Sequence, residues 1–225
     1  MCNGESVYIT QSEFAGERKS STVVNAGQCA KWLLDGRFST RVWGAIFAKY
    51  AIDNLRFHTG IRNCEDKLFL FSFLMNNDSD NVAYSSSRLY GYTVNRANSA
   101  TNSIWNGRMD VVLVSDIMDK IVTTDNPEWR AQSNKNRIVS RLDVMKNIVK
   151  TRNGSKDAKI VFNKIRAEVN SIEKPYDLRF RTRIELLALS IGKPAYIVLI
   201  KLFYFFVSDK ARNRGQEKQK VSICK

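Results

Sequence analysis

Residues 134–150 read Asn134-Lys-Asn-Arg-Ile-Val-Ser-Arg-Leu-Asp-Val-Met-Lys-Asn-Ile-Val-Lys150, and this stretch decides the fold class. Its large apolar residues recur at intervals of four, three and four, at Ile138, Leu142, Met145 and Val149. That spacing lines up one apolar stripe along an α-helix. The stretch therefore predicts an amphipathic helix, with Ser133 as its cap and Asn153-Gly154 at its end.

The same spacing predicts helices on both sides of this stretch. After it, a second basic helix is expected, capped by Ser155 and stopped by Pro175. A third is expected from about Asp177 to Ile191, with a break at Gly192. Before it, apolar spacing predicts helices over residues 22–36, 39–57 and 109–123. The apolar run 67–75 fits a helix or a strand, because periodicity does not assign it, and helix is slightly favoured. Among these, 39–57 is expected to be mostly buried and to form core and subunit contacts.

Residues 76–108 differ in character, because Asn, Ser and Asp dominate there and stabilise turns. We expect a small β-hairpin around Gly91 and a connection between two lobes in this region. The predicted fold is mostly α, a helical bundle with two lobes and flexible terminal arms. Its expected parts are an arm over 1–20, a helical core domain over 21–207 and a basic tail over 208–225.

Positive charge is concentrated in the second half of the chain. The 225 residues carry a net charge of +14 with 44% apolar residues, which is typical of a folded protein with a core. Residues 1–129 hold 13 Lys/Arg and 14 Asp/Glu (13 − 14 = −1), whereas residues 130–183 hold 15 and 5 (15 − 5 = +10). Such a directed positive field favours a polyanionic partner over the mixed charge that only keeps a protein soluble.

Catalytic and metal-binding patterns are weak. One histidine, His58, and four cysteines without a CxxC pair give no usual zinc-ligand set, and no phosphate-binding P-loop motif is present. Asp110, Asp116 and Asp119 could hold a metal for nuclease chemistry if brought together, although carboxylates on one helical face are usually solvated. We expect no enzyme activity and no cofactor. Met1–Ser6 lacks a signal-peptide pattern, so an intracellular protein is expected.

Basic and aromatic residues supply the candidate site. Phosphate binding needs only cations spaced along a surface, and arginine adds bidentate geometry. The candidate RNA-binding residues are Lys135, Arg137, Arg141, Lys146, Lys150, Arg152, Lys156, Lys159, Lys164, Arg166, Arg179, Arg181 and Arg183. Candidate base-stacking residues are Tyr176, Phe180 and Tyr92. The competing interpretation makes the aromatic residues part of the core and leaves the cations as solvated helix faces.

Residues 195–207 form the most apolar segment, Ala195-Tyr-Ile-Val-Leu-Ile-Lys-Leu-Phe-Tyr-Phe-Phe-Val207. A transmembrane interpretation is opposed by Lys193 and Pro194 beside it and by Lys201 inside it, because a central lysine costs roughly 2.5–3.5 kcal/mol on insertion. We therefore expect no stable membrane span. The segment is expected to be a helix or a strand that is buried in the core or in a subunit contact.

Two short segments show a family resemblance. Ser6-Val-Tyr-Ile-Thr-Gln-Ser-Glu-Phe14 is similar to the start of the coat proteins of rod-shaped, tobamovirus-like RNA viruses. Tyr176 followed by Arg181-Thr-Arg-Ile-Glu185 is similar to their late Tyr…Arg-x-x-Phe-Glu element, with Ile184 in place of Phe. This chain is longer and more basic than those proteins. The small helical nucleoproteins of segmented negative-strand RNA viruses also fit in size and charge, without a shared motif.

Both resemblances imply a nucleocapsid or coat protein that binds single-stranded RNA without sequence preference and polymerises along it. The expected location is then the virion and the host cytoplasm. Expected partners are RNA, further copies of the chain, and viral polymerase or host factors. Two alternatives remain: a matrix protein whose basic face binds anionic lipid, and an RNA-binding regulatory protein like a silencing suppressor.

Overall fold

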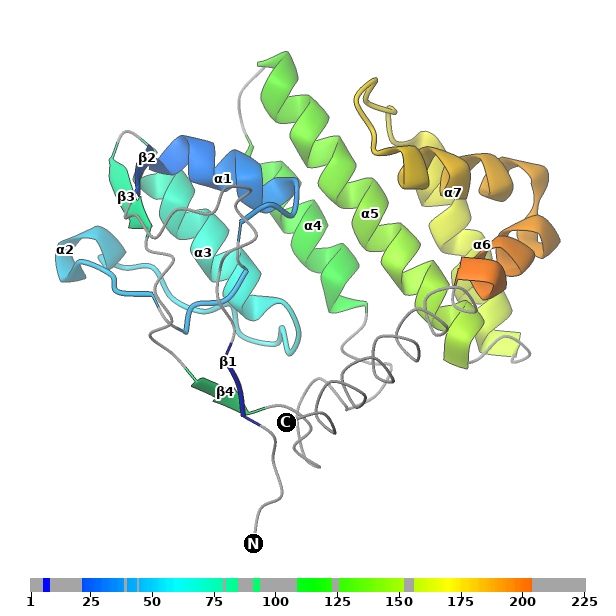
Figure 1. Ribbon diagram of the computed structural model, residues 1–225, viewed down its shortest axis with the longest axis horizontal. Coiled ribbons are helices and arrows are strands. Elements are labelled where there is room, and N and C mark those ends of the chain that lie inside the picture. Colours follow the sequence, from blue (N-terminus) through cyan, green and yellow to red (C-terminus); the bar gives the residue numbers. More distant parts are fainter. Residues whose placement is uncertain are drawn as a thin grey trace, which may run out of the picture. The chain divides into compact units, whose positions relative to one another are not determined.

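The computed structural model describes residues 6–8, 22–38, 40–43, 45–78, 80–84, 91–93, 109–122, 126–151 and 156–203. These residues are mostly helical with small antiparallel strand pairs, which confirms the predicted fold class (Figure 1). The arms and the basic tail lie outside the described residues, except for Ser6–Tyr8. The elements are β1 (Ser6–Tyr8), β2 (Thr22–Asn25), α1 (Ala26–Leu34), α2 (Lys49–Ile52), α3 (Glu65–Asn76), β3 (Asn81–Tyr84), β4 (Gly91–Thr93), α4 (Asp110–Ile121), α5 (Pro127–Thr151), α6 (Lys156–Ser171), α7 (Phe180–Ile191) and a helix over residues 193–203.

The chain divides into two compact units. Unit 1 comprises Met1–Arg141 and Ile172–Pro175, and unit 2 comprises Leu142–Ser171 and Tyr176–Lys225. The division falls inside α5 rather than at residues 76–108, where the sequence suggested a connection between lobes. The first part of α5 therefore belongs to unit 1, and its last part to unit 2.

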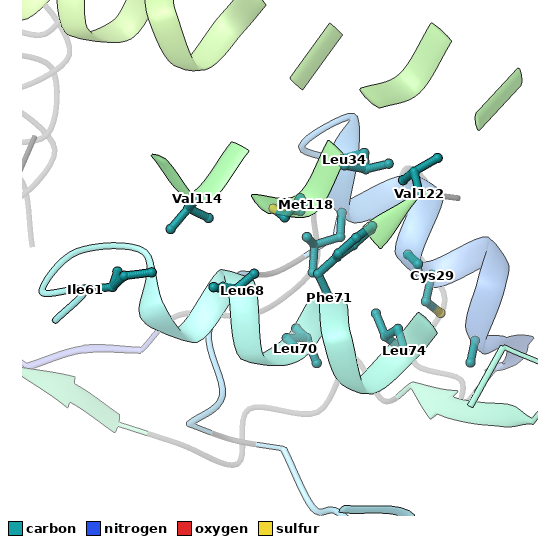
Figure 2. Close-up of a cluster of buried hydrophobic side chains, with 13 residues drawn as sticks. Cys29, Leu34, Ile61, Leu68, Leu70, Phe71, Leu74, Val114, Met118 and Val122 are labelled. Carbon is teal, nitrogen blue, oxygen red and sulfur yellow. The ribbon is translucent and has the colours of Figure 1, made fainter. Parts of the chain in front are cut away.

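Unit 1 is built on α3, which contacts both α1 and α4 (Figure 1). The apolar run 67–75, for which the sequence left helix or strand open, is helical and forms most of α3, and Phe71 at its centre is fully buried. Figure 2 shows Phe71 pointing from α3 into the cluster that includes Met118 of α4 and Leu34 of α1. Asn25 accepts a hydrogen bond from the Gln28 amide at 3.2 Å, which starts α1 directly after β2.

The strands pair segments that are far apart in the sequence. β1 runs antiparallel to β4, with Tyr8 opposite Gly91, and β2 runs antiparallel to β3, with Val24 opposite Val82. Gly91, around which a small hairpin was expected, lies in an antiparallel strand pair whose other strand is the N-terminal β1. The pair β2–β3 fixes the entry to α1, because the Ala26 amide donates to the Asp80 carbonyl at 2.9 Å.

The helix predicted over 39–57 is mostly absent. Among the described residues of this range, only those of α2 are helical, and Ile46 and Tyr50, expected to face inward, are exposed. The Phe47 ring instead packs edge-on against Phe69 and Phe73 of α3. Contacts to α3 determine the path of this segment, because aromatic packing outweighs a helix propensity that is only a weak preference.

The start of the long helix also differs from expectation. α5 begins at Pro127, and Ser133, predicted as its cap, lies inside it. Proline suits the first helical position because its missing N–H would have no partner there. The Ser133 hydroxyl instead donates to Asp119 Oδ1 at 2.6 Å.

Unit 2 packs the last part of α5 with α6, α7 and the 193–203 helix. The predicted stripe of α6 is buried, and the Phe162 ring meets the Tyr196 ring edge-on at 5.8 Å. The Tyr196 hydroxyl donates to the Leu142 carbonyl at 3.4 Å. The described part of the apolar segment is therefore a helix anchored by Tyr196 and Ile200, while residues 204–207 lie outside the described residues. Among the described helices, none combines the length and the apolar character needed to cross a bilayer.

Burial of Cys29 leads to a testable pH dependence. Burial raises the pKa of the Cys29 thiol from its ordinary 9.0 to about 11, because the charged thiolate loses hydration. Below pH 9 the thiol is neutral in both the folded and unfolded states. Between pH 9 and 11 the unfolded chain ionises first, so we expect the free energy of unfolding to fall over this range.

The measurement is urea denaturation at pH 8 and pH 11. Wild type and Cys64→Ala, which removes the half-buried thiol, are expected to lose stability by the same amount. Cys29→Ala is expected to lose less stability, because it lacks the buried thiol that ionises more readily in the unfolded chain than in the folded protein. An equal loss in Cys29→Ala would contradict the assignment.

Candidate nucleic-acid interface

Two arginines predicted to bind phosphate are paired with carboxylates of α4. Arg141 is buried, and its Nη2 lies 2.8 Å from Oδ2 and 3.0 Å from Oδ1 of Asp116. Arg137 Nε lies 3.1 Å from Asp116 Oδ1, and its Nη1 lies 3.2 Å from Asp119 Oδ2. Guanidinium groups held in this way join α4 to α5 and carry little free charge. We therefore leave Arg137 and Arg141 out of the candidate interface.

Lys135 is also buried rather than exposed at the surface. Its Nζ lies 4.0 Å from Asp35 Oδ1 and 3.4 Å from Gln132 Oε1, and the residue is buried. It belongs to a run of five consecutive buried polar residues: Gln132, Ser133, Asn134, Lys135 and Asn136. Periodicity could not reveal this run, because polar residues cover every side of the helix there. Lys67 Nζ donates to Asn136 Oδ1 at 2.6 Å, so distant residues supply the partners.

In unit 2, one buried carboxylate engages two of the predicted cations. Glu185 of α7 is buried, and its Oε1 accepts from Arg181 Nε at 3.1 Å. Lys146 Nζ lies 3.5 Å from Glu185 Oε2 and 2.6 Å from Asp143 Oδ1. Lys146 is therefore an internal cation, whereas the Arg181 side chain stays 59% exposed and keeps access to solvent.

The remaining predicted cations are mostly exposed. The exposed residues are Lys150, Lys159, Lys164, Arg179 and Arg183. Arg166 is half-buried and donates to the Ser190 carbonyl at 3.4 Å. Lys159 and Lys164 are about 140° apart around α6, so the helix does not bring them into one row. Arg152 lies outside the described residues, as do the side chains of Lys156 and Tyr92.

A basic–aromatic turn, residues 176–183, holds the best-formed part of the site. Leu178 is buried and anchors the turn, while Tyr176 is 88% and Phe180 78% exposed. The Arg183 guanidinium folds back and donates to the Tyr176 carbonyl. Arg179 is exposed at the start of α7. The structure thus joins Arg183 to the backbone of Tyr176 and leaves Tyr176 and Arg179 exposed in the same segment.

The electrostatics of this turn favour an anion. The segment contains one acidic residue, Asp177, and three arginines, Arg179, Arg181 and Arg183. The Arg181 guanidinium lies 4.8 Å from the centre of the Phe203 ring and its Nε pairs with Glu185 Oε1 at 3.1 Å, so part of its charge is compensated. Such groups can bind phosphate through paired N–H donors, and the Tyr176 ring can stack on a base.

Carboxylates that sequence alone could assign to a metal have other partners. Asp110 accepts from the Arg62 and Asn63 amides at 2.8 and 3.1 Å. Asp116 and Asp119 bind the arginines of α5. Within the described ranges, no group of three His, Cys, Asp or Glu side chains could hold a metal ion. His58 is exposed, with Nδ1 2.9 Å from the Thr59 carbonyl oxygen.

Comparison of the chain with known protein families, curated proteins and solved structures finds no match.

Proposed function

We propose that this protein binds single-stranded RNA without sequence preference and coats it, as a viral nucleocapsid or coat protein does. The observation that carries the proposal is the basic–aromatic turn, where Tyr176 is 88% exposed and its backbone carbonyl accepts a hydrogen bond from the Arg183 guanidinium, with Arg179 exposed in the same segment. Arginine binds phosphate on any sequence, and an aromatic ring stacks on any base. The turn therefore combines the two kinds of contact that sequence-independent binding needs.

The proposed site is smaller than the one expected from sequence. Lys135, Arg137 and Arg141 are buried or paired with carboxylates, so they contribute little to phosphate binding. Two phosphate contacts, from Arg179 and Arg183, give a slope of log K against log salt of about −1.4 for a single strand, and Arg181 adds less because it is paired with Glu185. Exposed Lys159 and Lys164 on α6 add to the positive field of the same unit.

The stacking contact is tested with Tyr176→Ala. Loss of one base–aromatic stack is expected to weaken binding to an oligo-uridine by roughly 5- to 150-fold. Fluorescence anisotropy of a labelled oligonucleotide measures the affinity. Tyr50→Ala is the matched control, because Tyr50 is as exposed as Tyr176 (85% against 88%) but lies in unit 1. Equal affinities for the two variants would refute the role of Tyr176.

The same assay tests the phosphate contacts. Arg179→Gln is expected to reduce the salt slope by about 0.7, while Arg62→Gln, an exposed control in unit 1, leaves it unchanged. A salt-independent affinity in the wild-type protein would contradict the proposal as a whole. Negative-stain microscopy of the protein with RNA tests coating, and rods or rings are the expected images.

A further inference from the structure

Glu185 is a buried carboxylate of α7 that faces two cations of unit 2. The residue is 2% exposed, and its Oε1 accepts a hydrogen bond from Arg181 Nε at 3.1 Å. Its Oε2 lies 3.5 Å from Lys146 Nζ, an ion-pair contact without a hydrogen bond. A carboxylate has two acceptor oxygens, so Glu185 can serve both cations at once.

Stability does not account for the place of Arg181. A cation in the first turn of a helix opposes the helix dipole, and a cation four residues before a glutamate is the less favourable order of such a pair. Lys146, with 19% of its side chain exposed, already compensates Glu185 from inside the unit. The Arg181 side chain is 59% exposed, and an ion pair at such a position adds little stability. The pairing is therefore better explained by what it does to Arg181.

The contacts of Arg181 orient its guanidinium group and leave one edge unoccupied. Nε is bound to Glu185, and the guanidinium carbon lies 4.8 Å from the centre of the Phe203 ring. Within the described part of the chain, Nη1 and Nη2 have no hydrogen-bond partner. Because a guanidinium group is planar, the two contacts set the direction of this Nη edge. Parallel N–H groups of this kind bind two oxygens of one phosphate.

We propose that Glu185 is a positioning residue for phosphate binding, which holds Arg181 so that its Nη edge binds a phosphate group of the strand. This inference rests on the proposed function and adds Arg181 to its site. Glu185 compensates part of the charge of Arg181, so the contribution of Arg181 comes mainly from geometry. A side chain that is ordered before the strand binds loses less conformational entropy on binding.

Arg181→Lys tests whether the planar guanidinium is needed. Lysine keeps the charge, but it cannot bind Glu185 through one edge and phosphate through another. The affinity for an oligo-uridine is expected to fall roughly tenfold at every salt concentration, with the salt slope little changed. Arg62→Lys is the matched control, because Arg62 is an exposed arginine of unit 1, and it is expected to bind as wild type does. Equal affinities for these two variants would overturn the proposal.

Glu185→Gln separates positioning from charge. The change removes the negative charge beside Arg181, so the salt slope is expected to steepen by at most about 0.7. The single carboxamide oxygen cannot serve both Arg181 and Lys146, so Arg181 is held less well. At about 1 M salt the logarithm of the salt concentration is zero and the counterion contribution vanishes, so the affinity extrapolated to that point reports the other contacts. This extrapolated affinity is expected to fall roughly fivefold.

Removal of the second cation is expected to rescue the variant. In Lys146→Met/Glu185→Gln, the carboxamide oxygen has no competing cation and can accept from Arg181 Nε. The extrapolated affinity is expected to return to that of wild type, whereas the salt slope stays steeper. Lys146→Met alone is the control and is expected to leave the extrapolated affinity unchanged. Failure of the rescue would contradict the positioning role.

Folding is controlled in two ways. In Glu185→Gln, Lys146 keeps Asp143 as a partner at 2.6 Å, and far-UV circular dichroism compares the helix content of each variant with that of wild type. Arg181→Lys changes an exposed side chain, so it tests the proposal even where a change at the buried position lowers stability.

Three further results would overturn the inference. An unchanged extrapolated affinity in Glu185→Gln would show that Glu185 does not position Arg181. A raised one would show that Glu185 holds Arg181 away from the strand. A loss that is as large in the Arg181→Lys background as in wild type would show that Glu185 acts through other groups. Each of these results is obtained with a wild type that binds RNA, so it leaves the proposed function standing, whereas a wild type that does not bind RNA contradicts both.

Discussion

Phe71→Ala is expected to lower the free energy of unfolding of unit 1 by about 4 kcal/mol. Phe71 is fully buried in the cluster formed by α1, α3 and α4 (Figure 2). Truncation removes its transfer free energy and leaves a cavity whose lining loses dispersion contacts. All four tryptophans, Trp32, Trp43, Trp105 and Trp129, lie in Met1–Arg141, so tryptophan fluorescence during urea denaturation reports on this unit.

Two further variants make the measurement specific. Phe71→Leu keeps most of the volume and is expected to cost well under half as much as Phe71→Ala. Ile46→Ala deletes apolar atoms at a fully exposed position and is expected to change stability by less than about 0.5 kcal/mol. A cost for Phe71→Ala as small as that of Ile46→Ala would show that the cluster is not the core of unit 1.

Asp116→Ala is expected to lower the free energy of unfolding by about 3 kcal/mol. The change leaves Arg141 buried without its carboxylate partner and removes one of the two carboxylates that hold Arg137. A buried cation that loses its carboxylate also loses the attraction that offset its lost hydration. Urea denaturation followed by tryptophan fluorescence measures the loss.

The control variant removes an exposed carboxylate. Asp143 pairs with Lys146 at 2.6 Å, but its side chain is 56% exposed, so Asp143→Ala is expected to cost less than about 1 kcal/mol. The double variant Asp116→Leu/Arg141→Met replaces the ion pair with apolar side chains. It is expected to recover much of the stability, since such a replacement is often neutral. Equal costs for Asp116→Ala and Asp143→Ala would show that the α4–α5 ion pairs are not structural.

Helical segments with regular apolar spacing were predictable from sequence. Ile138, Leu142, Met145 and Val149 are all buried in α5, as their intervals require. The predicted helix before Gly192 ends at that residue, where φ is +145°, a conformation open to glycine. These features depend on neighbours a few positions away, so the chain itself contains the information.

The path of residues 39–57 was not predictable in this way. Near-helical spacing of Val42, Ile46 and Tyr50 predicted a buried helix, yet most of the segment is not helical. Its position depends on where Phe69 and Phe73 of α3 are placed, and no local pattern in 39–57 contains that information.

The candidate site likewise has features that were predictable from the sequence and features that were not. The alternation of arginine with an aromatic residue in 176–183 is local and was readable from the sequence. Which side chains are exposed was not: Tyr176 and Phe180 are open to solvent, and Leu178 between them is buried. The polar run of α5 likewise had no sequence signal, because its partners come from other elements.

By itself, the sequence determined that this protein is mostly helical, where its regular helices lie and that its positive charge is concentrated after residue 130. Only the tertiary structure decided which of those charges can reach a partner. Arg137 and Arg141 are neutralised by the carboxylate of Asp116, which lies 21 and 25 positions away from them in the sequence. The physical reason is that periodicity reports contacts along one helix, whereas the pairing of charges depends on which helices meet.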